Sequence, residues 1–178
     1  KTLSPSKGIT IGENQYPRAI YTLWSTAERE AIGIYEVVWD NTNKKDEAYY
    51  NNTNQSFDFA GGVATASFGS ATAKSLDDVT EDGVTTAGLK TQHKKTIKQQ
   101  ASGHLTPTDW YVIKATEVES YSVPSAITTY RANVRTRSNE MEVLIDACST
   151  VDELATLYAY TGEPDSRTRP LGEWPEEV

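Results

Sequence analysis

Two histidines and one cysteine are the residues of this sequence with the greatest potential for metal or nucleophilic chemistry. His93 and His104 stand among lysines or loop residues, and neither has a second ligand at the one-turn spacing that helical metal sites use. Cys148 is the only cysteine, so the chain can form neither an internal disulfide nor a thiolate cluster. We therefore expect no metal site, and we interpret Cys148 as a small buried apolar residue.

Catalysis by carboxylates is the next possibility, because acidic residues gather in one stretch of the chain. Asp77 with Asp78, and Glu81 with Asp82, belong to a region that has the composition of a solvated linker. General acid or base catalysis needs desolvation, which such a linker does not provide. The sequence also lacks a glycine-rich phosphate loop and a nucleophile elbow. We therefore expect a protein that is not an enzyme and that uses no cofactor.

The charge balance argues against nucleic acid as a partner. The chain has 25 acidic and 17 basic residues, and its formal charge of -8 repels phosphate backbones. The lysines from Lys90 to Lys98 precede Trp110 and could suggest a basic-aromatic platform, but lysines on one side of an amphipathic helix are usually its solvated side. No apolar run approaches the roughly 20 residues that span a bilayer, so we expect a soluble protein without a membrane partner.

The sequence predicts an α+β fold made of two small modules. Alternating apolar residues dominate the first half, whereas the apolar spacing changes from two to about four residues in the second half. Stretches rich in Gly, Pro or acidic residues separate these regions. The predicted parts are an extended arm (1–15), a small α+β module (16–70), an acidic linker (71–86), a helical hairpin module (87–160) and a proline-rich C-terminal tail (161–178).

The N-terminal module is predicted to combine one short helix with a small sheet. Ser25 and Glu28 have the spacing of a capping box at the start of that helix. The first strand, IYEVVW, carries bulky residues on both of its faces. We interpret residues 34–70 as an antiparallel meander of three or four strands, with a tight hairpin turn at Gly61 and Gly62.

The C-terminal module is predicted to be a pair of helices followed by a short third helix. Leu89, His93, Ile97, Ala101 and Leu105 recur every four residues, which puts them on one side of the first helix. The second and longest helix is predicted to begin at PSAITTYR, and its apolar spacing continues as far as the cysteine. The stretch TVDELATLY has the capping residues and apolar positions of the third helix.

The segment LTPTDWYVI joins the two long predicted helices. Its aspartate is interpreted as a turn residue, and WYVI alternates like a short extended segment that can lie along the groove between the helices. Arg131 on the second helix could stack on Trp110 or pair with Asp109. We name this predicted arrangement the clasp, and its residues are Leu105, Asp109, Trp110, Tyr111, Tyr130, Arg131 and Arg135.

The clasp carries a resemblance to a known family. In order, a basic helix, LTPTDW, a variable acidic loop and PSAITTYRANVR resemble the C-terminal module of tail-fibre assembly chaperones and related tail proteins of tailed phages. Ile127 and Thr136 depart from the family pattern, which has a large apolar residue such as Trp and an Asp at these places. The N-terminal stretch WSTAEREAIGIYEV is similar to small modules of phage tail and baseplate-associated proteins.

The resemblance implies a bacteriophage protein that acts through contacts with other tail or fibre proteins and with copies of itself. It also implies a location in the virion tail, or in the host cytoplasm during assembly. Two roles stay open, because the same residues serve both. One is a permanent tail, fibre or adaptor subunit of the virion, and the other is a transient assembly chaperone that is absent from the virion.

Aromatic residues outside the clasp predict further partner contacts. Tyr49, Tyr50, Phe57 and Phe59 form a tyrosine-rich ribbon, which is also the candidate site if the chain is a carbohydrate-binding module. Trp174 lies in an otherwise polar tail, where a tryptophan is expected to dock on its own chain or on a neighbouring protein.

Overall fold

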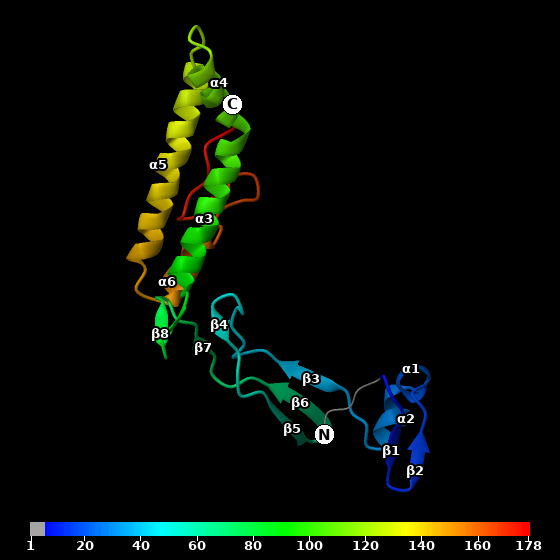
Figure 1. The fold of residues 1–178 in the computed structure, drawn as a ribbon. Helices are drawn as coiled ribbons and strands as arrows, with labels where there is room; N and C mark the ends of the chain where they lie inside the picture. The colour runs from blue at the N-terminus through cyan, green and yellow to red at the C-terminus, as the bar shows by residue number, and fades with distance from the viewer. Residues whose placement is uncertain (1–5) are drawn as a thin grey trace. The chain divides into compact units, whose positions relative to one another are not determined.

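The computed structural model describes residues 6–178 and divides the chain into two compact units. The first unit extends to Thr72, and the second begins at Ala73. Strands predominate in the first unit and helices in the second, so the predicted α+β class is confirmed (Figure 1).

A short hairpin precedes the first helix. β1 (Ile9–Ile11) and β2 (Asn14–Tyr16) pair antiparallel. Gly12, in the turn between them, has a φ of 60°, in the left-handed region that glycine favours. The predicted extended arm is therefore wrong from Ile9 onward, because a tight glycine turn folds it back on itself. The first five residues of that arm lie outside the described part of the structure.

Two short helices follow the hairpin, where one was predicted. α2 (Thr26–Ala31) begins at the predicted capping box, which is confirmed: the Glu28 N–H donates to Ser25 Oγ at 3.3 Å, and the Ser25 N–H donates to Glu28 Oε2 at 2.8 Å. The bonds from Ser25 lower the pKa of the Glu28 carboxyl. α1 (Ile20–Leu23) is the additional helix, and four residues are too few to show a helical period in the sequence.

A three-stranded sheet forms the largest strand element of the first unit. Its central strand is β6 (Val63–Ser67), with β3 (Val37–Asp40) on one side and β5 (Ser56–Ala60) on the other. β5 and β6 pair antiparallel across the predicted turn, where Gly61 and Gly62 have φ values of 59° and 81°. The predicted hairpin is therefore confirmed, and it uses the glycine pair because both turn positions need a positive φ.

β3 runs parallel to β6, so the prediction of an entirely antiparallel meander is wrong. The connection from β3 to β5 is long, and Asn52 closes a loop within it by bonding both the N–H and the C=O of Lys45, at 2.9 and 2.8 Å. A long connection lets the β5–β6 hairpin fold so that β6 lies beside β3. Within this connection, β4 (Tyr50–Asn51) pairs with β7 (Thr72–Ala73), the strand in which the first unit ends.

A second hairpin precedes the long helices. β8 (Val79–Glu81) and β9 (Val84–Thr86) pair antiparallel around Asp82 and Gly83, whose φ values are 50° and 78°. Two successive positive φ values suit a two-residue hairpin turn of the Asp-Gly kind. The stretch 71–86, predicted as a linker, therefore contains regular structure, because its Asp-Gly dipeptide closes a hairpin.

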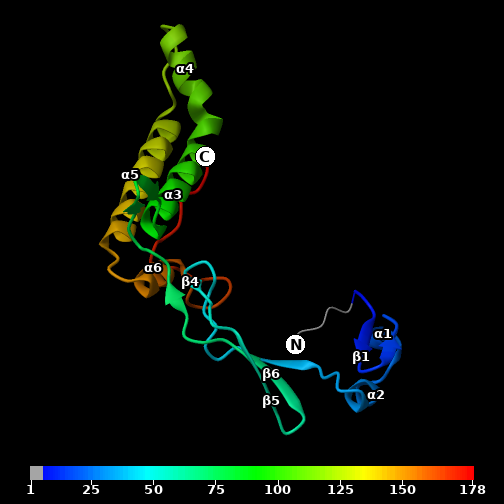
Figure 2. The same cartoon turned by 60° about the horizontal axis from the view of Figure 1, so that its bottom comes forward.

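Two long antiparallel helices dominate the second unit. α3 (Leu89–Leu105) and α5 (Ser125–Ala147) lie side by side in both views (Figures 1 and 2). Between them come a short 3-10 turn, η1 (Thr106–Thr108), and the helix α4 (Asp109–Glu117). The predicted third helix is α6 (Val151–Tyr158), so the helical hairpin with a short following helix is present.

The core of this unit follows the predicted apolar spacing with one exception. Cys148 is buried, as predicted. Leu144 is exposed, although it was predicted to face the core, because Met141 and Ile145 define the buried stripe of α5 and Leu144 lies at its edge. The buried hydrophobic residues of the second unit are Leu89, Ile97, Ala101, Ile127, Tyr130, Val134, Met141, Ile145, Cys148, Val151, Leu154 and Leu171.

Two lysines of α3 pair with carboxylates of α5. Lys94 Nζ lies 2.7 Å from Asp146 Oδ1, and Lys98 Nζ lies 3.2 Å from Glu142 Oε2. The bond to Asp146 raises the pKa of the Lys94 ammonium. The interpretation of this lysine row as a solvated face holds for Lys98, whose side chain is 67% exposed, but the Lys94 side chain is only 28% exposed, because its ammonium lies against Asp146 of α5.

The imidazole of His93 is expected to make stability depend on pH. Its ring lies 4.7 Å from the ring of Tyr158, and burial lowers the pKa of His93. As the pH falls, the imidazole of His93 is therefore protonated in the unfolded chain before it is protonated in the folded chain. The neutral imidazole favours folding fully above the ordinary pKa of about 6.5, and this stabilisation is lost as the pH falls below that value. We expect urea unfolding to show a lower free energy at about pH 5.5 than at about pH 7.5.

The control for this prediction is the second histidine. His93→Gln should reduce the pH dependence between these two conditions, whereas His104→Gln should retain the part due to His93. A His93→Gln chain with the full pH dependence of the wild type would show that other groups cause it.

Candidate interaction surfaces

Arg131 closes the turn that follows α3. Arg131 is a buried residue of α5. Its guanidinium donates from Nη1 to Leu105 O at 2.9 Å and to Thr108 Oγ1 at 2.6 Å. Nη2 donates to Asp109 Oδ1 at 2.8 Å. The carbonyl of Leu105 stands at the end of α3, where helical carbonyls lack a partner within the helix. Arg131 therefore joins the end of one helix, the 3-10 turn and the start of the next.

The rest of the predicted clasp is arranged differently. Residues 110–113 are helical in α4, so the predicted extended segment is wrong; alternation over four residues is too short to distinguish the two structures. Trp110 is 51% exposed and lies beside Tyr111, with ring centroids 3.8 Å apart, so it does not stack on Arg131. Arg135 is exposed and donates to the Arg131 carbonyl at 3.3 Å, so it does not face Asp109. Of the pairings considered for Arg131, the one with Asp109 is present.

Trp110→Ala is expected to change the free energy of unfolding by less than about 1 kcal/mol, because half-exposed side chains outside the core contribute little. Tyr130→Ala is the control, since Tyr130 is buried and its truncation should cost about 3–5 kcal/mol. Urea unfolding of both variants makes the comparison. A loss for Trp110→Ala as large as that for Tyr130→Ala would place Trp110 in the core.

The C-terminal segment returns along the helix pair and is held by its main chain. Leu171 is fully buried, and its N–H donates to Leu157 O at 2.9 Å. Arg137, on α5, donates from Nη2 to Leu171 O at 2.7 Å and from Nε to Glu173 O at 3.1 Å. Gly172 lies between these two carbonyls with a φ of 80°, and a Cβ added there would stand 1.2 Å from Arg137 Nη2. Only glycine fits this position without a shift of the guanidinium.

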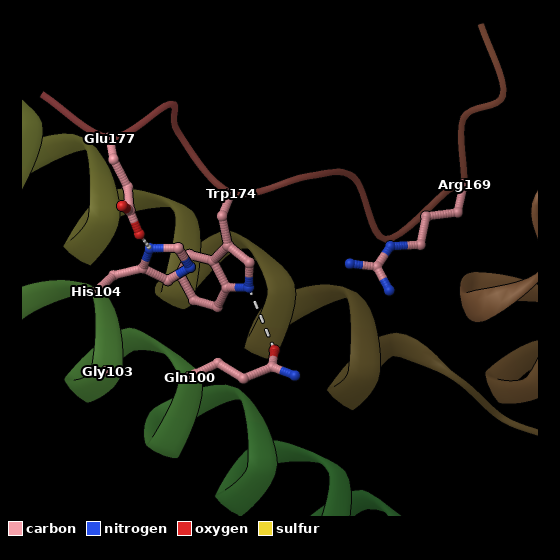
Figure 3. Close-up of a pocket in the computed structure, with 6 residues that line it drawn as sticks. All are labelled: Gln100, Gly103, His104, Arg169, Trp174 and Glu177. Atoms are coloured by element: carbon pink, nitrogen blue, oxygen red, sulfur yellow. Dashed lines mark hydrogen bonds and ion pairs between the residues drawn. The ribbon is translucent and has the colours of Figure 1, made fainter. Parts of the chain in front are cut away.

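Trp174 anchors the same segment, and it docks on its own chain. It packs against the buried cluster of Ala101, Tyr130 and Val134, and its Nε1 donates to Gln100 Oε1 at 3.2 Å. Figure 3 shows its ring against that of His104, with centroids 5.1 Å apart. An open hollow of about 330 Å³ remains beside these rings. Its lining residues are Gln100, Gly103, His104, Arg169, Trp174 and Glu177.

His104 connects the segment to both helices. Its Nδ1 lies 3.1 Å from Tyr130 Oη on α5. The same atom lies 3.7 Å from Glu177 Oε1 near the C-terminus (Figure 3). His104 therefore serves as a hydrogen-bonding and stacking residue in the structure. Among the described residues, no three His, Cys, Asp or Glu side chains are grouped so that they could hold a metal ion.

The sheet of the first unit has one apolar face that is largely exposed. Trp39 and Phe57 flank Ala66 in register, and Phe59 stands opposite Ala64 in the next row. Because residues paired across strands share a face, the three aromatic rings lie on one side. Trp39, Phe57 and Phe59 are 55%, 52% and 55% exposed, whereas Ala66 between them is fully buried. We call this surface the aromatic face.

The aromatic face differs from the predicted tyrosine-rich ribbon. Phe57 and Phe59 belong to it, but Tyr50 is buried in the separate β4–β7 pairing, with Lys45 Nζ 4.2 Å from its ring centroid. Tyr49 is half-buried, and burial raises the pKa of its hydroxyl. Trp39 was not among the predicted contacts, although its alternation within IYEVVW is the signal that places it on the apolar side of its strand.

Comparisons with protein-family models, curated proteins and solved structures gave no match to this chain. The description of these surfaces therefore depends on their own geometry. In the part of the chain from residue 6 onward, no helix is both long and apolar enough to span a bilayer.

Proposed function

We propose that the chain is a non-enzymatic subunit of a bacteriophage tail, fibre or adaptor, and that it acts through contacts with other subunits of the particle. The observation that carries a contact-based function is the aromatic face. Contiguous exposed apolar surface on a folded unit is typical of protein interaction sites. The proposed partner is another structural subunit of the same particle, a second copy of this chain included.

The small core of the first unit supports this proposal. The buried hydrophobic residues of its described part are four in number: Ile20, Ile34, Tyr50 and Ala66. Ordering each residue of a chain costs about 1–2 kcal/mol of backbone conformational entropy, which burial of apolar surface must offset. Covering Trp39, Phe57 and Phe59 with a partner would add apolar burial that the unit lacks by itself. A subunit that is stabilised by assembly fits this arrangement.

The composition of the aromatic face favours protein over carbohydrate as the partner. Saccharide sites combine aromatic stacking with convergent polar groups that bond the sugar hydroxyls. The described residues that share this face in the sheet register are Val37, Trp39, Phe57, Phe59, Ala64 and Ala66, whereas the opposite face mixes polar residues such as Asp58 and Thr65 with the smaller apolar residues Val38 and Val63. The sheet positions of this face are all apolar, and an apolar surface of this kind suits burial against another protein.

The assignment to a phage tail rests on the resemblance of LTPTDW and PSAITTYRANVR to tail-fibre assembly chaperones and related tail proteins. Asp109 and Arg131, which belong to those two motifs, meet in one hydrogen-bonded turn. This supports the interpretation of the two motifs as parts of one folded module. A permanent subunit is preferred to a transient chaperone because the aromatic face and the small core favour lasting burial.

Purified virions provide the test of this function. Mass spectrometry of the particles should find the chain in many copies. A chain that is found only in lysates, as a free protein that never sediments with particles, would favour the transient chaperone. Glycan-array binding that is lost when Trp39 and Phe57 are replaced would favour the carbohydrate-binding alternative.

Replacing the aromatic face should impair incorporation into the particle. Trp39→Ser with Phe57→Ser is expected to lower the copy number per virion at least about tenfold, because buried aromatic anchors usually dominate an interface. Thr65→Ser, on the opposite face, is the matched control and should leave the copy number unchanged. Quantitative mass spectrometry of purified particles measures both, and equal copy numbers would exclude the aromatic face as the contact.

A further inference from the structure

We infer that the C-terminal segment and its binding site on the helices form a self-recognition pair, in which the segment of one copy can occupy the site of a second copy. We name residues 171–177 the strap, and the residues of α3 and α5 that hold it the strap site. The strap-site residues are Gln100, Ala101, His104, Tyr130, Val134 and Arg137. This inference is independent of the proposed function, since it concerns the second unit only.

The strap site binds the main chain of the strap. Arg137 donates to the carbonyls of Leu171 and Glu173, and the Leu157 carbonyl accepts from the Leu171 N–H. Glu140 holds the same guanidinium, with its Oε2 2.8 Å from Arg137 Nη1. Main-chain bonds of this kind give affinity for a peptide whatever chain it belongs to, and pockets for alternate side chains give the specificity.

The side chains of the strap supply that specificity. Leu171 is fully buried, and Trp174 covers the apolar cluster between the two helices. Glycine is favoured at position 172, because its φ is 80° and a Cβ there would force the Arg137 guanidinium to shift. These three requirements define a short motif, Leu-Gly-x-Trp, and the strap of a second copy supplies the same motif.

The connection to the strap allows it to leave its own site. Residues 159–168 are all exposed, and the contacts among them are local: the bridge between Thr161 and Thr168, the bond from the Ser166 N–H to Glu163 O at 3.0 Å, and Arg167 at 5.0 Å from the Tyr160 ring. No buried side chain lies between Tyr158 and Leu171, so the connector can change direction without unpacking the helical core. Exchange of identical elements between copies re-forms every contact of the closed state and is a low-cost route to association.

Charge does not oppose the exchanged arrangement. Glu177 of the strap faces His104, and Glu173 faces Arg169 of its own segment. A second copy brings the same charges to the same partners, so no new like-charge contact arises within the site. Within one chain the strap has the advantage of a high effective concentration, so exchange is expected where copies are concentrated, as in an assembly.

A complementary pair of full-length variants tests the inference. The strap variant carries Leu171→Ala and Trp174→Ala, which weaken the segment and leave the site intact. The site variant carries Arg137→Ala, which removes the bonds to the Leu171 and Glu173 carbonyls and leaves the strap intact. We expect each to be monomeric alone and the mixture to form a one-to-one dimer, with an affinity at least about tenfold above the self-association of either variant.

Light scattering after size-exclusion chromatography measures the oligomeric state of these mixtures and of their control. A site variant that also carries the two strap substitutions should form no dimer with the strap variant. Monomers in the first mixture, when circular dichroism shows both variants folded, would overturn the inference.

If the strap variant does not fold, the wild-type chain provides a second test of the inference. Dimers that form at high concentration should dissociate when a synthetic peptide of residues 168–178 is added in excess. The same peptide with Gly172→Ala should be at least about tenfold weaker. A wild-type chain that stays monomeric and does not bind the peptide would overturn the inference. Either failure leaves the aromatic face, which belongs to the first unit, unaffected.

Discussion

Gly172→Ala is expected to release the C-terminal strap from the helices. A residue other than glycine at a φ of 80° costs about 1–2 kcal/mol in the left-handed region. The added Cβ would also displace the Arg137 guanidinium from Leu171 O and Glu173 O, and each lost bond costs about 0.5–1.5 kcal/mol. Together these effects weaken strap docking by about 2–5 kcal/mol.

Hydrogen exchange of the Leu171 amide measures this effect, because that N–H is protected by Leu157 O only while the strap is docked. A loss of about 2 kcal/mol or more corresponds to exchange at least about 30-fold faster. Gly162→Ala is the matched control, since Gly162 also has a positive φ, of 98°, but does not contact Arg137. Unchanged protection in the Gly172 variant would mean that Arg137 does not hold the strap.

The helices of the second unit could be predicted because their signals are local and repeated. The four-residue spacing from Leu89 to Leu105 marks the side of α3 that packs on α5. The capping box of α2 is equally local, since Ser25 and Glu28 bond each other within one turn. Such patterns are set by residues that are near in sequence, so the sequence alone is sufficient to place them.

The sheet and α4 show where local patterns stop being sufficient. Alternation along IYEVVW predicts the faces of β3, but it contains nothing about which strand lies beside β3 or in which direction. WYVI fits both an alternating segment and one turn of helix, and the structure makes it helical. The direction of β3 depends on a long connection, whose path is set by tertiary contacts and not by strand propensity.

The contacts of Arg131 and of Arg137, both on α5, also differ in how far the sequence predicts them. Arg131 could be matched to Asp109 because a turn that brings two helices together places their facing residues side by side. Nothing similar links Arg137 to the strap, since its two bonds go to main-chain carbonyls, which any sequence provides. Trp174 is the one signal in the sequence that this proline-rich end docks, and the burial of Leu171 and the positive φ of Gly172 show in the structure that the contact is specific.

Arg131→Ala is expected to be the most damaging single change in the turn after α3. It removes the guanidinium donor from the buried Thr108 hydroxyl and from the Leu105 carbonyl, which retains the bond from Thr108 Oγ1 at 2.8 Å. Loss of a donor to buried acceptors, together with an ion pair, costs about 2–4 kcal/mol. The estimate stays below that for a fully buried pair because the Asp109 side chain is about half exposed, so water can solvate its carboxylate.

Three variants separate the roles of the guanidinium by urea unfolding. Asp109→Asn removes only the ion pair and should cost about 0.5–1 kcal/mol. Arg131→Lys retains a charge but cannot reach three acceptors with one ammonium group, so its loss should lie between the other two. If Arg131→Ala cost no more than Asp109→Asn, the bonds to Leu105 O and Thr108 Oγ1 would contribute nothing. In that case the packing of Leu105 and Trp174 against Ala101, Tyr130 and Val134 would fix the end of α3.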